Sequence, residues 1–211
     1  MVTRYEGIIF DLGGVVIDWN PRHLYRRVFS GDENKIDWFL SVICPMEWNE
    51  KQDAGRKLQD GIAERVSLFP EWSEEIHAYY EQWIEMIGGA VPGTGVLLGE
   101  LAAAGVRLFA LSNWSTETFP LVADRFDELR LFERIFLSGD LRVAKPDARC
   151  YLAALKEIDV PPERLVFVDD NPRNVLAAES VGLQGIVFRS ADTLRQDLKR
   201  PGLHNLDSAR T

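Results

Sequence analysis

The chain has 211 residues, which is enough for one large domain or for one domain that carries an insertion. Hydrophobic residues make up 46% of it and charged residues 27%, which excludes a disordered chain or a coiled coil. The formal net charge of −9 argues against nucleic acid or an anionic membrane as a partner, although a few local cations or a metal would still admit a phosphorylated substrate. Cys44 and Cys150 are far apart, and residues 1–10 match neither a signal peptide nor a membrane span. We therefore expect a cytoplasmic protein.

Short apolar runs rich in β-forming residues recur along the chain, and most of them are followed by a helical pattern. They cover residues 7–10, 106–111, 134–137, 165–168 and 185–188. Strands that alternate with helices are typical of a parallel sheet covered by helices on both faces. The sequence therefore predicts an α/β, Rossmann-like fold.

Residues from about 22 to 88 interrupt this alternation. They contain no convincing strand, yet they include Trp38, Trp48, Trp72 and Trp83. Apolar residues between 76 and 87 recur at helical spacing, which predicts an amphipathic helix with Ser73 as its N-cap. We interpret the stretch as an inserted helical cap with hinges at Asn20-Pro21 and Gly88-Gly89. The expected division is a core domain of residues 1–20 and 89–200, a cap of residues 21–88, and a frayed tail of residues 201–211.

Four polar signals follow predicted strands or lie just beyond them: Asp11, Ser112-Asn113, Lys145 and Asp169-Asp170. Each alone has an ordinary structural explanation, since aspartate and serine often cap helices and a Lys-Pro pair usually lies on a solvated surface. The carboxyl ends of parallel strands, however, meet along one edge of an open sheet, where ligands bind. We therefore expect the four signals to converge in one site.

The aspartates in this set suit phosphoryl transfer. Asp11 is predicted to be the nucleophile, because a carboxylate is able to form an acyl phosphate. Asp11, Asp170 and the backbone carbonyl of Gly13 are predicted to hold Mg²⁺, which prefers oxygen ligands. Asp169 is expected to support this group.

The other polar residues suit the binding of a phosphate. Lys145 would offset the negative charge of the aspartates and contact the phosphate. Ser112, Asn113 and nearby backbone amides would bind the remaining phosphoryl oxygens, since electrostatic positioning supplies most of the catalysis in this chemistry.

These motifs resemble those of the haloacid dehalogenase superfamily of hydrolases, and the likeness covers roughly residues 5–190. Within that superfamily, bacterial α-D-glucose-1-phosphate phosphatases and their relatives are most similar to the segments FDLGGVVIDWNP, WNEKQDAGR, LSGDLRVAKPDARCYL and FVDDNPRNVLAA. The resemblance implies a Rossmann-like core, a small helical cap of subfamily I, Mg²⁺ as the cofactor, and hydrolysis through an aspartyl phosphate. The motifs are specific for the superfamily and much less specific for the substrate.

The chain departs from the pattern of this superfamily at Gly13. Most of its phosphatases carry an aspartate two residues after the nucleophile, which protonates the leaving group, whereas the glucose-1-phosphatase-like proteins share the glycine. One alternative is a metal-independent 2-haloacid dehalogenase, since halide leaves without a proton; another is a non-catalytic phosphate-binding or regulatory protein. The pair Asp169-Asp170 favours Mg²⁺ and phosphate over dehalogenation. Without an acid, the rate would depend steeply on the leaving group.

The cap is expected to choose the substrate by closing over the site. Trp48, Asn49 and Glu50 are predicted to face the leaving group, with the indole against a sugar face and the polar side chains at its hydroxyls. For Trp48, packing in the core of the cap is an equal alternative.

Several residues near the site have more than one predicted role. Asn174 would either bond the water shell of the metal or stabilise its own helix. Asp18 is expected to pair with a hinge arginine such as Arg22. His23, like Glu50, is a candidate for the missing acid. A positive φ is one explanation for glycine at position 13.

The sequence thus predicts an enzyme, a Mg²⁺-dependent phosphatase that acts on a small phosphate monoester. A sugar phosphate is the expected substrate class, with a sugar-1-phosphate among the candidates. The expected partner is this small molecule, with neither nucleic acid nor membrane, and the expected state is a monomer or a weak homodimer.

Overall fold

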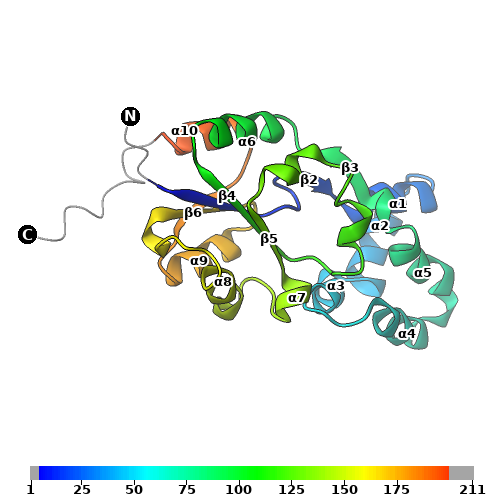
Figure 1. Ribbon diagram of the computed structural model, residues 1–211. Helices are drawn as coiled ribbons and strands as arrows, with labels where there is room; N and C mark the ends of the chain where they lie inside the picture. The colour runs from blue at the N-terminus through cyan, green and yellow to red at the C-terminus, as the bar shows by residue number, and fades with distance from the viewer. Residues whose placement is uncertain (1–4, 200–211) are drawn as a thin grey trace, which may run out of the picture.

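The computed structural model describes residues 5–199, and its main element is a five-stranded sheet with the order β5-β4-β1-β6-β7 (Figure 1). Every neighbouring pair of strands is parallel. The strands are β1 (Gly7–Phe10), β4 (Arg107–Ser112), β5 (Arg134–Leu137), β6 (Leu165–Asp169) and β7 (Gln184–Val187). The predicted α/β fold is confirmed, and each strand lies within about one residue of its expected bounds. The tail predicted to fray, residues 201–211, lies outside the described residues.

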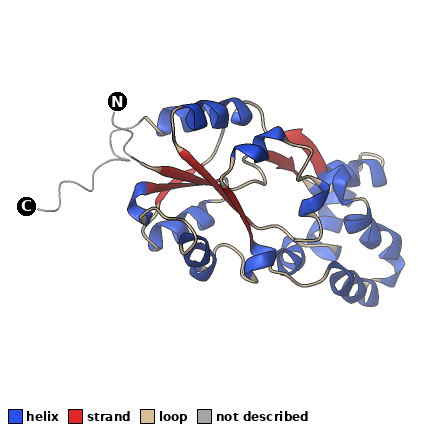
Figure 2. Cartoon of the chain, in the orientation of Figure 1, coloured by secondary structure: helices blue, strands red, loops and turns tan. Residues whose placement is uncertain are grey.

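Helices cover both faces of this sheet (Figure 2). One face carries α6 (Thr94–Ala103) and α10 (Ala191–Asp197), and the other carries α8 (Ala148–Leu155) and α9 (Pro172–Ser180). Within residues 5–199, no helix combines the length and the apolar character that a membrane crossing needs.

Strand β1 lies at the centre of the sheet, between β4 and β6. Its side chains alternate between the two faces, so that Ile8 and Phe10 join the hydrophobic cluster with α6 and Ile9 joins the cluster with α8. A strand that is buried on both faces must be apolar throughout, and Asp11 is the first position beyond it. The strand order therefore brings the carboxyl ends of β1, β4 and β6 together at the point where ligands bind in such sheets.

Between β2 (Ile17–Trp19) and β3 (Ile87–Ala90) the chain forms a group of helices that lies beside the sheet, and we call this group the cap (Figure 1). A single hydrophobic cluster runs from one face of the sheet into the cap and includes Tyr25, Trp48 and Tyr79. The division of the chain into a core and a cap domain stays a prediction. The cap helices are α1 (Pro21–Val28), α2 (Glu33–Trp38), α3 (Met46–Asp53), α4 (Leu58–Leu68) and α5 (Ser73–Glu81).

The amphipathic helix that was predicted to reach Ile87 is shorter than expected. Helix α5 ends at Glu81, a 3-10 turn covers Trp83–Met86, and Ile87 begins β3. The apolar residues of all three elements pack on one hydrophobic cluster, so helical spacing alone did not reveal where the helix ends. Ser73 is not the N-cap, because a 3-10 turn over Pro70–Trp72 runs directly into α5.

The two connections between sheet and cap lie side by side. Strands β2 and β3 pair in antiparallel fashion, and the backbone N–H of Asn20 donates to the carbonyl of Met86 at 2.8 Å. The predicted hinges at residues 20–21 and 88–89 therefore belong to or adjoin a hydrogen-bonded ribbon. Sequence patterns did not reveal this ribbon, because its strands are short and lie on either side of the whole cap.

The expected ion pair between Asp18 and Arg22 is wrong. Asp18 Oδ2 lies 3.0 Å from His23 Nε2, while Arg22 pairs with Glu33 at 2.7 Å and also with Asp37. These acidic partners belong to α2. Successive side chains of α1 point to different sides of the helix, so Arg22 faces α2 while His23 faces Asp18.

Candidate active site

Asp11 directly follows β1 and is almost fully buried, with 8% of its surface exposed. Its Oδ1 accepts hydrogen bonds from the backbone N–H of Leu12 at 2.7 Å and from the Ser112 hydroxyl at 2.8 Å. Lys145 Nζ lies 3.0 Å from the same oxygen. Among the described residues, these contacts all use Oδ1 and none of them uses Oδ2. The neighbouring strands β1 and β4 thus position Asp11 and Ser112 together, and the second carboxylate oxygen is left for a ligand.

Lys145 reaches the same edge of the sheet from the loop between α7 (Ser138–Leu141) and α8. Its side chain is fully buried, and Nζ lies 2.7 Å from Asp169 Oδ2 as well as against Asp11. Asn113 fixes this loop through two reciprocal bonds, since its Nδ2 donates to the carbonyl of Lys145 at 2.9 Å and its Oδ1 accepts from the N–H of Lys145 at 2.8 Å. In this structure Asn113 therefore positions the lysine.

Asp169 is the last residue of β6 and is fully buried. Its Oδ1 accepts from the backbone N–H of Asn171 at 2.8 Å, and Asn174 Nδ2 lies 3.1 and 3.0 Å from its two oxygens. With Lys145 on Oδ2, both oxygens are occupied, so Asp169 anchors the lysine. In this structure the Asn174 side chain orients Asp169, and its predicted bond to the water shell of a metal stays a prediction.

The carboxylates and the lysine of this group shift one another's pKa values. Burial raises the pKa of Asp11 to about 7; Lys145 opposes this rise and Asp169 adds to it. Burial by itself would lower the pKa of Lys145, but Asp11 and Asp169 outweigh it and the pKa is raised, so the ammonium stays charged. Burial and the neighbouring Asp169 also raise the pKa of Asp170. A divalent cation bound here would favour the ionised form of these carboxylates.

Asp170 brings a third carboxylate to the group. One ligand oxygen from each of Asp11, Asp169 and Asp170 lies within 4.8 Å of the others. Because Asp169 is already bound by Lys145 and Asn174, Asp11 Oδ2 and Asp170 are the carboxylate oxygens left for a cation. Hard oxygen donors of this kind fit Mg²⁺.

The turn after Asp11 requires glycine at position 14, whereas position 13 has room for a side chain. Gly14 has φ of +73°, and a Cβ there would lie 2.4 Å from Asp170 Oδ2. Gly13 lies outside the left-handed region, and a Cβ at this position would meet nothing within 4 Å. A positive φ is therefore not the explanation for glycine at position 13.

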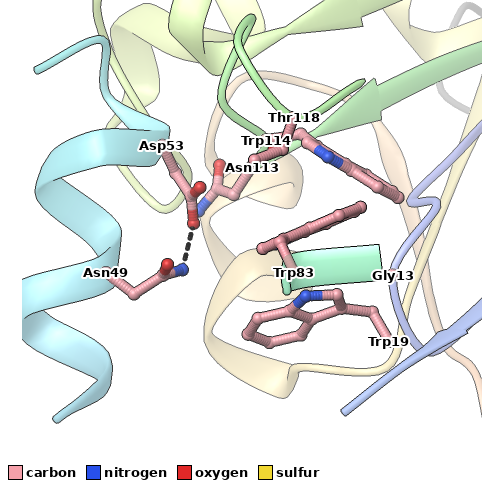
Figure 3. Close-up of a pocket in the computed structure, with 8 residues that line it drawn as sticks. All are labelled: Gly13, Trp19, Asn49, Asp53, Trp83, Asn113, Trp114 and Thr118. Carbon is pink, nitrogen blue, oxygen red and sulfur yellow. Dashed lines mark hydrogen bonds between the residues drawn. The ribbon is translucent and has the colours of Figure 1, made fainter. Parts of the chain in front are cut away.

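A cavity of about 40 Å³ lies next to these residues and has room for roughly three water molecules. Its walls come from both the sheet side and the cap (Figure 3). Three indoles give it apolar surface, and amide, hydroxyl and carboxyl groups give it polar surface. The lining residues are Gly13, Trp19, Asn49, Asp53, Trp83, Asn113, Trp114 and Thr118.

Trp48 and Asn49 are neighbours on α3 but serve different regions. Trp48 is 1% exposed, its indole N–H donates to the carbonyl of Gly61 at 3.0 Å, and its ring packs against Tyr79 and Tyr80. The prediction that Trp48 contacts the leaving group is therefore wrong, and the packing alternative is correct. Asn49 lines the cavity, as the prediction requires.

Sequence reasoning missed several residues that line the cavity. Trp114 directly follows Asn113, so its place beside a strand end was a usable signal. Trp19 and Trp83 come together only through the pairing of β2 with β3, which the sequence did not reveal. Asp53 carries a weak signal of its own, because an acidic residue at the C-terminal end of a helix faces the negative end of the helix dipole.

Comparisons with known proteins place the chain in a family. The model of the haloacid dehalogenase-like hydrolases matches residues 5–182. A sesquiterpene phosphatase of Aspergillus oryzae is 28% identical over 186 residues, which are 88% of this chain and 91% of that protein. An (S)-2-haloacid dehalogenase of Pseudomonas fluorescens is 32% identical over 203 residues, with 86% of this chain and 83% of that protein covered.

A solved structure shares the fold. It is a haloacid dehalogenase family enzyme of Bacteroides thetaiotaomicron in complex with magnesium and inorganic phosphate, and the TM-score is 0.65 at 20% identity. The match covers 88% of this chain and 95% of that one. With the family match over most of its length and its polar residues gathered at the ends of β1, β4 and β6, this chain belongs to the haloacid dehalogenase-like hydrolases.

Proposed function

We propose that the protein is a Mg²⁺-dependent phosphatase that hydrolyses a small phosphate monoester through an aspartyl phosphate at Asp11. The observation that carries this proposal is the environment of Asp11, whose Oδ1 is held by Ser112 and Lys145 and one of whose oxygens lies within 4.8 Å of a carboxylate oxygen of Asp170. A carboxylate nucleophile, a buried ammonium and spare oxygen ligands are the groups that phosphoryl transfer uses.

In this proposal each side chain at the strand ends has one task. Asp11 attacks the phosphorus atom. Ser112 and Lys145, which already contact Asp11, hold phosphoryl oxygens at the point of attack, so that the nucleophile and the phosphorus approach in a fixed orientation. Asn113 keeps the lysine in place through its two bonds to the backbone of Lys145.

Asp11, Asp170 and the backbone carbonyl of Gly13 would hold the metal ion. When bound, Mg²⁺ neutralises negative charge on the phosphate and favours the ionised nucleophile. Asp169 would remain with Lys145 and Asn174, which saturate its two oxygens.

The cavity supports a leaving group that has both apolar and polar surface. Trp19, Trp83 and Trp114 bring indole rings to its wall, and Asn49 and Thr118 bring an amide and a hydroxyl. We therefore infer a sugar phosphate as the substrate. Since the cavity as it stands has room for only about three water molecules, the cap would open to admit the sugar and close over it to exclude water. The similarity to a sesquiterpene phosphatase supports a second candidate, a terpenyl phosphate whose hydrocarbon would contact the indoles.

Dehalogenation is the rival reaction, because a haloacid dehalogenase is among the relatives. The acidic group argues against it. A 2-haloacid brings its own carboxylate, which Asp170 would repel, whereas a phosphate would share a cation with Asp170.

The test is an assay of the metal-stripped protein with and without added Mg²⁺. The substrates are glucose 1-phosphate, glucose 6-phosphate, farnesyl phosphate, p-nitrophenyl phosphate and 2-chloropropionate. We expect phosphate release only with Mg²⁺ and faster release from the sugar-1-phosphate than from farnesyl phosphate. Faster release from farnesyl phosphate would support the terpenyl candidate. Chloride release without metal would contradict the proposal, and phosphate binding without any hydrolysis would indicate a non-catalytic protein.

A further inference from the structure

The proposed mechanism needs a proton donor for the departing ester oxygen, and position 13 carries none because it is glycine. We propose that Asp53, the last residue of α3 in the cap, is the general acid and base of the reaction. This inference rests on the proposed phosphatase function. A well-placed proton donor accelerates such a step by about 10²–10⁴-fold, so its presence or absence is measurable.

Asp53 faces the same cavity as the turn that follows the nucleophile. Both Asp53 and Gly13 line it, together with Asn113, whose neighbour Ser112 contacts Asp11. Figure 3 shows the carboxyl of Asp53 pointing from α3 toward Asn113. Asp53 therefore brings a carboxyl to this cavity from the cap. A side chain at position 13 would reach the same cavity from the core.

The orientation of the Asp53 carboxyl is fixed by a chain of hydrogen bonds. Asn49 lies one helical turn earlier on α3, and its Nδ2 donates to Asp53 Oδ2 at 2.7 Å. Tyr80 donates its hydroxyl to Asn49 Oδ1 at 2.9 Å and accepts from Gln52 Nε2 at 3.0 Å. Because Tyr80 occupies the amide oxygen of Asn49, the amide nitrogen must face Asp53. Oδ2 of Asp53 is thus the acceptor in this bond, and the carboxyl is held in one orientation.

The surroundings of Asp53 favour the neutral acid. Burial raises its pKa well above the usual range, and the charges of Glu50 on α3 and Asp11 in the core add to the rise. Among the described residues, the backbone N–H of Ser115 is the group that opposes the rise. The C-terminal end of α3 also disfavours negative charge. These surroundings favour the protonated carboxyl, which is the form that a general acid needs.

The end of α3 is docked on the core, so the position of Asp53 depends on contact between cap and core. The Ser138 hydroxyl donates to the carbonyl of Asp53 at 2.5 Å, and Arg142 Nη1 donates to the carbonyl of Gly55 at 2.7 Å. Gly55 has φ of +96°, and a Cβ there would lie 2.9 Å from the carbonyl oxygen of Gly139. The proton donor is thus in place only when the cap is docked, which couples proton transfer to a closed site.

The other candidates for the acid are less well placed. His23 is paired with Asp18 at the ribbon, and Glu50 is exposed on α3; neither lines the cavity. Lys145 lies between Asp11 and Asp169, and these carboxylates hold its proton.

The proposed reaction balances in two steps. First, an oxygen of Asp11 bonds to phosphorus, the bond from phosphorus to the ester oxygen breaks, and the proton of Asp53 moves to that oxygen to give the alcohol. Second, water bonds to phosphorus and gives a proton to the Asp53 carboxylate, while the bond from phosphorus to Asp11 breaks. Inorganic phosphate leaves, and both aspartates return to their starting states.

The test compares two esters of similar shape, benzyl phosphate with a poor leaving group and p-nitrophenyl phosphate with a good one. We expect Asp53→Asn to lower kcat/KM for benzyl phosphate about 100-fold or more and for p-nitrophenyl phosphate less than about tenfold, because only the poor leaving group needs the proton. The variant should also release a burst of nitrophenol stoichiometric with the enzyme, since loss of the base slows dephosphorylation. Glu47→Gln, which changes an exposed carboxyl on the same helix, should match the wild type on both esters.

A second variant tests the inference without altering Asp53. Since a Cβ at position 13 meets nothing within 4 Å, Gly13→Asp should fold, and it should restore benzyl phosphate hydrolysis in the Asp53→Asn background. In the wild-type background it should gain less than about threefold, because an acid is already present. Two outcomes would overturn the role of Asp53 while leaving the phosphatase function intact. One is a large gain from Gly13→Asp in the wild-type background, and the other is an equal loss of kcat/KM on both esters in Asp53→Asn without a burst. Failure of the wild type to hydrolyse any ester would overturn the proposed function and this inference with it.

Discussion

The ends of the sheet strands and the end of α3 face one cavity, but they place their carboxyl groups in different surroundings. Burial raises the pKa of both Asp11 and Asp53, yet a cation opposes the rise only at Asp11, where Lys145 Nζ lies 3.0 Å away. Asp53 has a neutral amide as its side-chain partner instead. Chemically identical side chains are thereby suited to different tasks, an anionic nucleophile in the core and a neutral proton donor in the cap.

The largest expected effect comes from the nucleophile on the core side. Asp11→Asn should lower kcat/KM for every ester by about 10⁴-fold or more, because an amide is a poor nucleophile. The variant should keep its fold, since the neutral asparagine side chain does not carry the desolvation cost of a buried carboxylate. Steady-state kinetics beside a thermal melt measures both properties. Turnover near that of the wild type would remove Asp11 from the mechanism.

The next effect tests the cation that distinguishes the two regions. Lys145→Ala should reduce the free energy of unfolding by about 3–5 kcal/mol, because Asp11 and Asp169 would remain buried without a counterion. Lys51 provides a matched control, since its side chain is 56% exposed and its ion pair with Glu64 spans 3.6 Å. Lys51→Ala should cost less than about 1 kcal/mol. Equal losses in urea denaturation would show that Lys145 does not stabilise the site.

The dependence of activity on Mg²⁺ should distinguish a residue at the strand ends, Asp170, from the cap residue Asp53. Asp170→Asn should raise the Mg²⁺ concentration needed for half-maximal activity by about tenfold or more, because it removes a charged ligand. Asp53→Asn should leave that concentration unchanged while it lowers the rate. A Mg²⁺ titration of both variants measures the difference. If Asp170→Asn kept the metal dependence of the wild type, the assignment of Asp170 as a ligand would be wrong.

The last expected effect concerns how the stability of the protein depends on pH. The pKa of Asp53 is raised in the folded protein and is about 3.9 in the unfolded chain, so its contribution to stability is fully present below that pH and is lost as the pH rises toward the folded value. Asparagine does not ionise and avoids this loss. Asp53→Asn should therefore be more stable than the wild type at pH 7, by about 1.4 kcal/mol for each unit of pKa shift, and similar to it near pH 4.

Urea denaturation between pH 4 and pH 7 checks this sign. A wild type that is more stable than Asp53→Asn at pH 7 would show that Asp53 is ionised in the folded protein. Asp53 would then be a carboxylate, as Asp11 is, and not a proton donor.

The sheet and its strand-end residues were predictable from the sequence, for a physical reason. Strands buried on both faces must be apolar, so a polar residue directly after each run marks where the strand meets the edge of the sheet. Asp11, Ser112 and Asp169 each stand at such a position, and a parallel sheet brings these positions together. Lys145 was also singled out from the sequence, although it lies in a loop rather than at a strand end, and Asn113 holds that loop at the site.

The cap side of the cavity was less predictable, because its residues meet through docking rather than through local pattern. Asp53 faces the core through contacts with Ser138 and with the loop around Ser115, far away in the chain. Trp48 looked like a substrate contact in a polar segment, but its neighbours Tyr79 and Tyr80 come from another helix and bury it. No spacing within residues 46–53 reveals which side of α3 meets the cavity.

The most direct test of the account is mass spectrometry of the protein after acid quench during turnover of p-nitrophenyl phosphate with Mg²⁺. The account predicts that the peptide containing Asp11 gains one phosphoryl group, that this adduct accumulates further in Asp53→Asn, and that it is absent from Asp11→Asn. If the wild type is active and yet no phosphate is found on Asp11 in the wild type or in Asp53→Asn, the aspartyl-phosphate mechanism is contradicted.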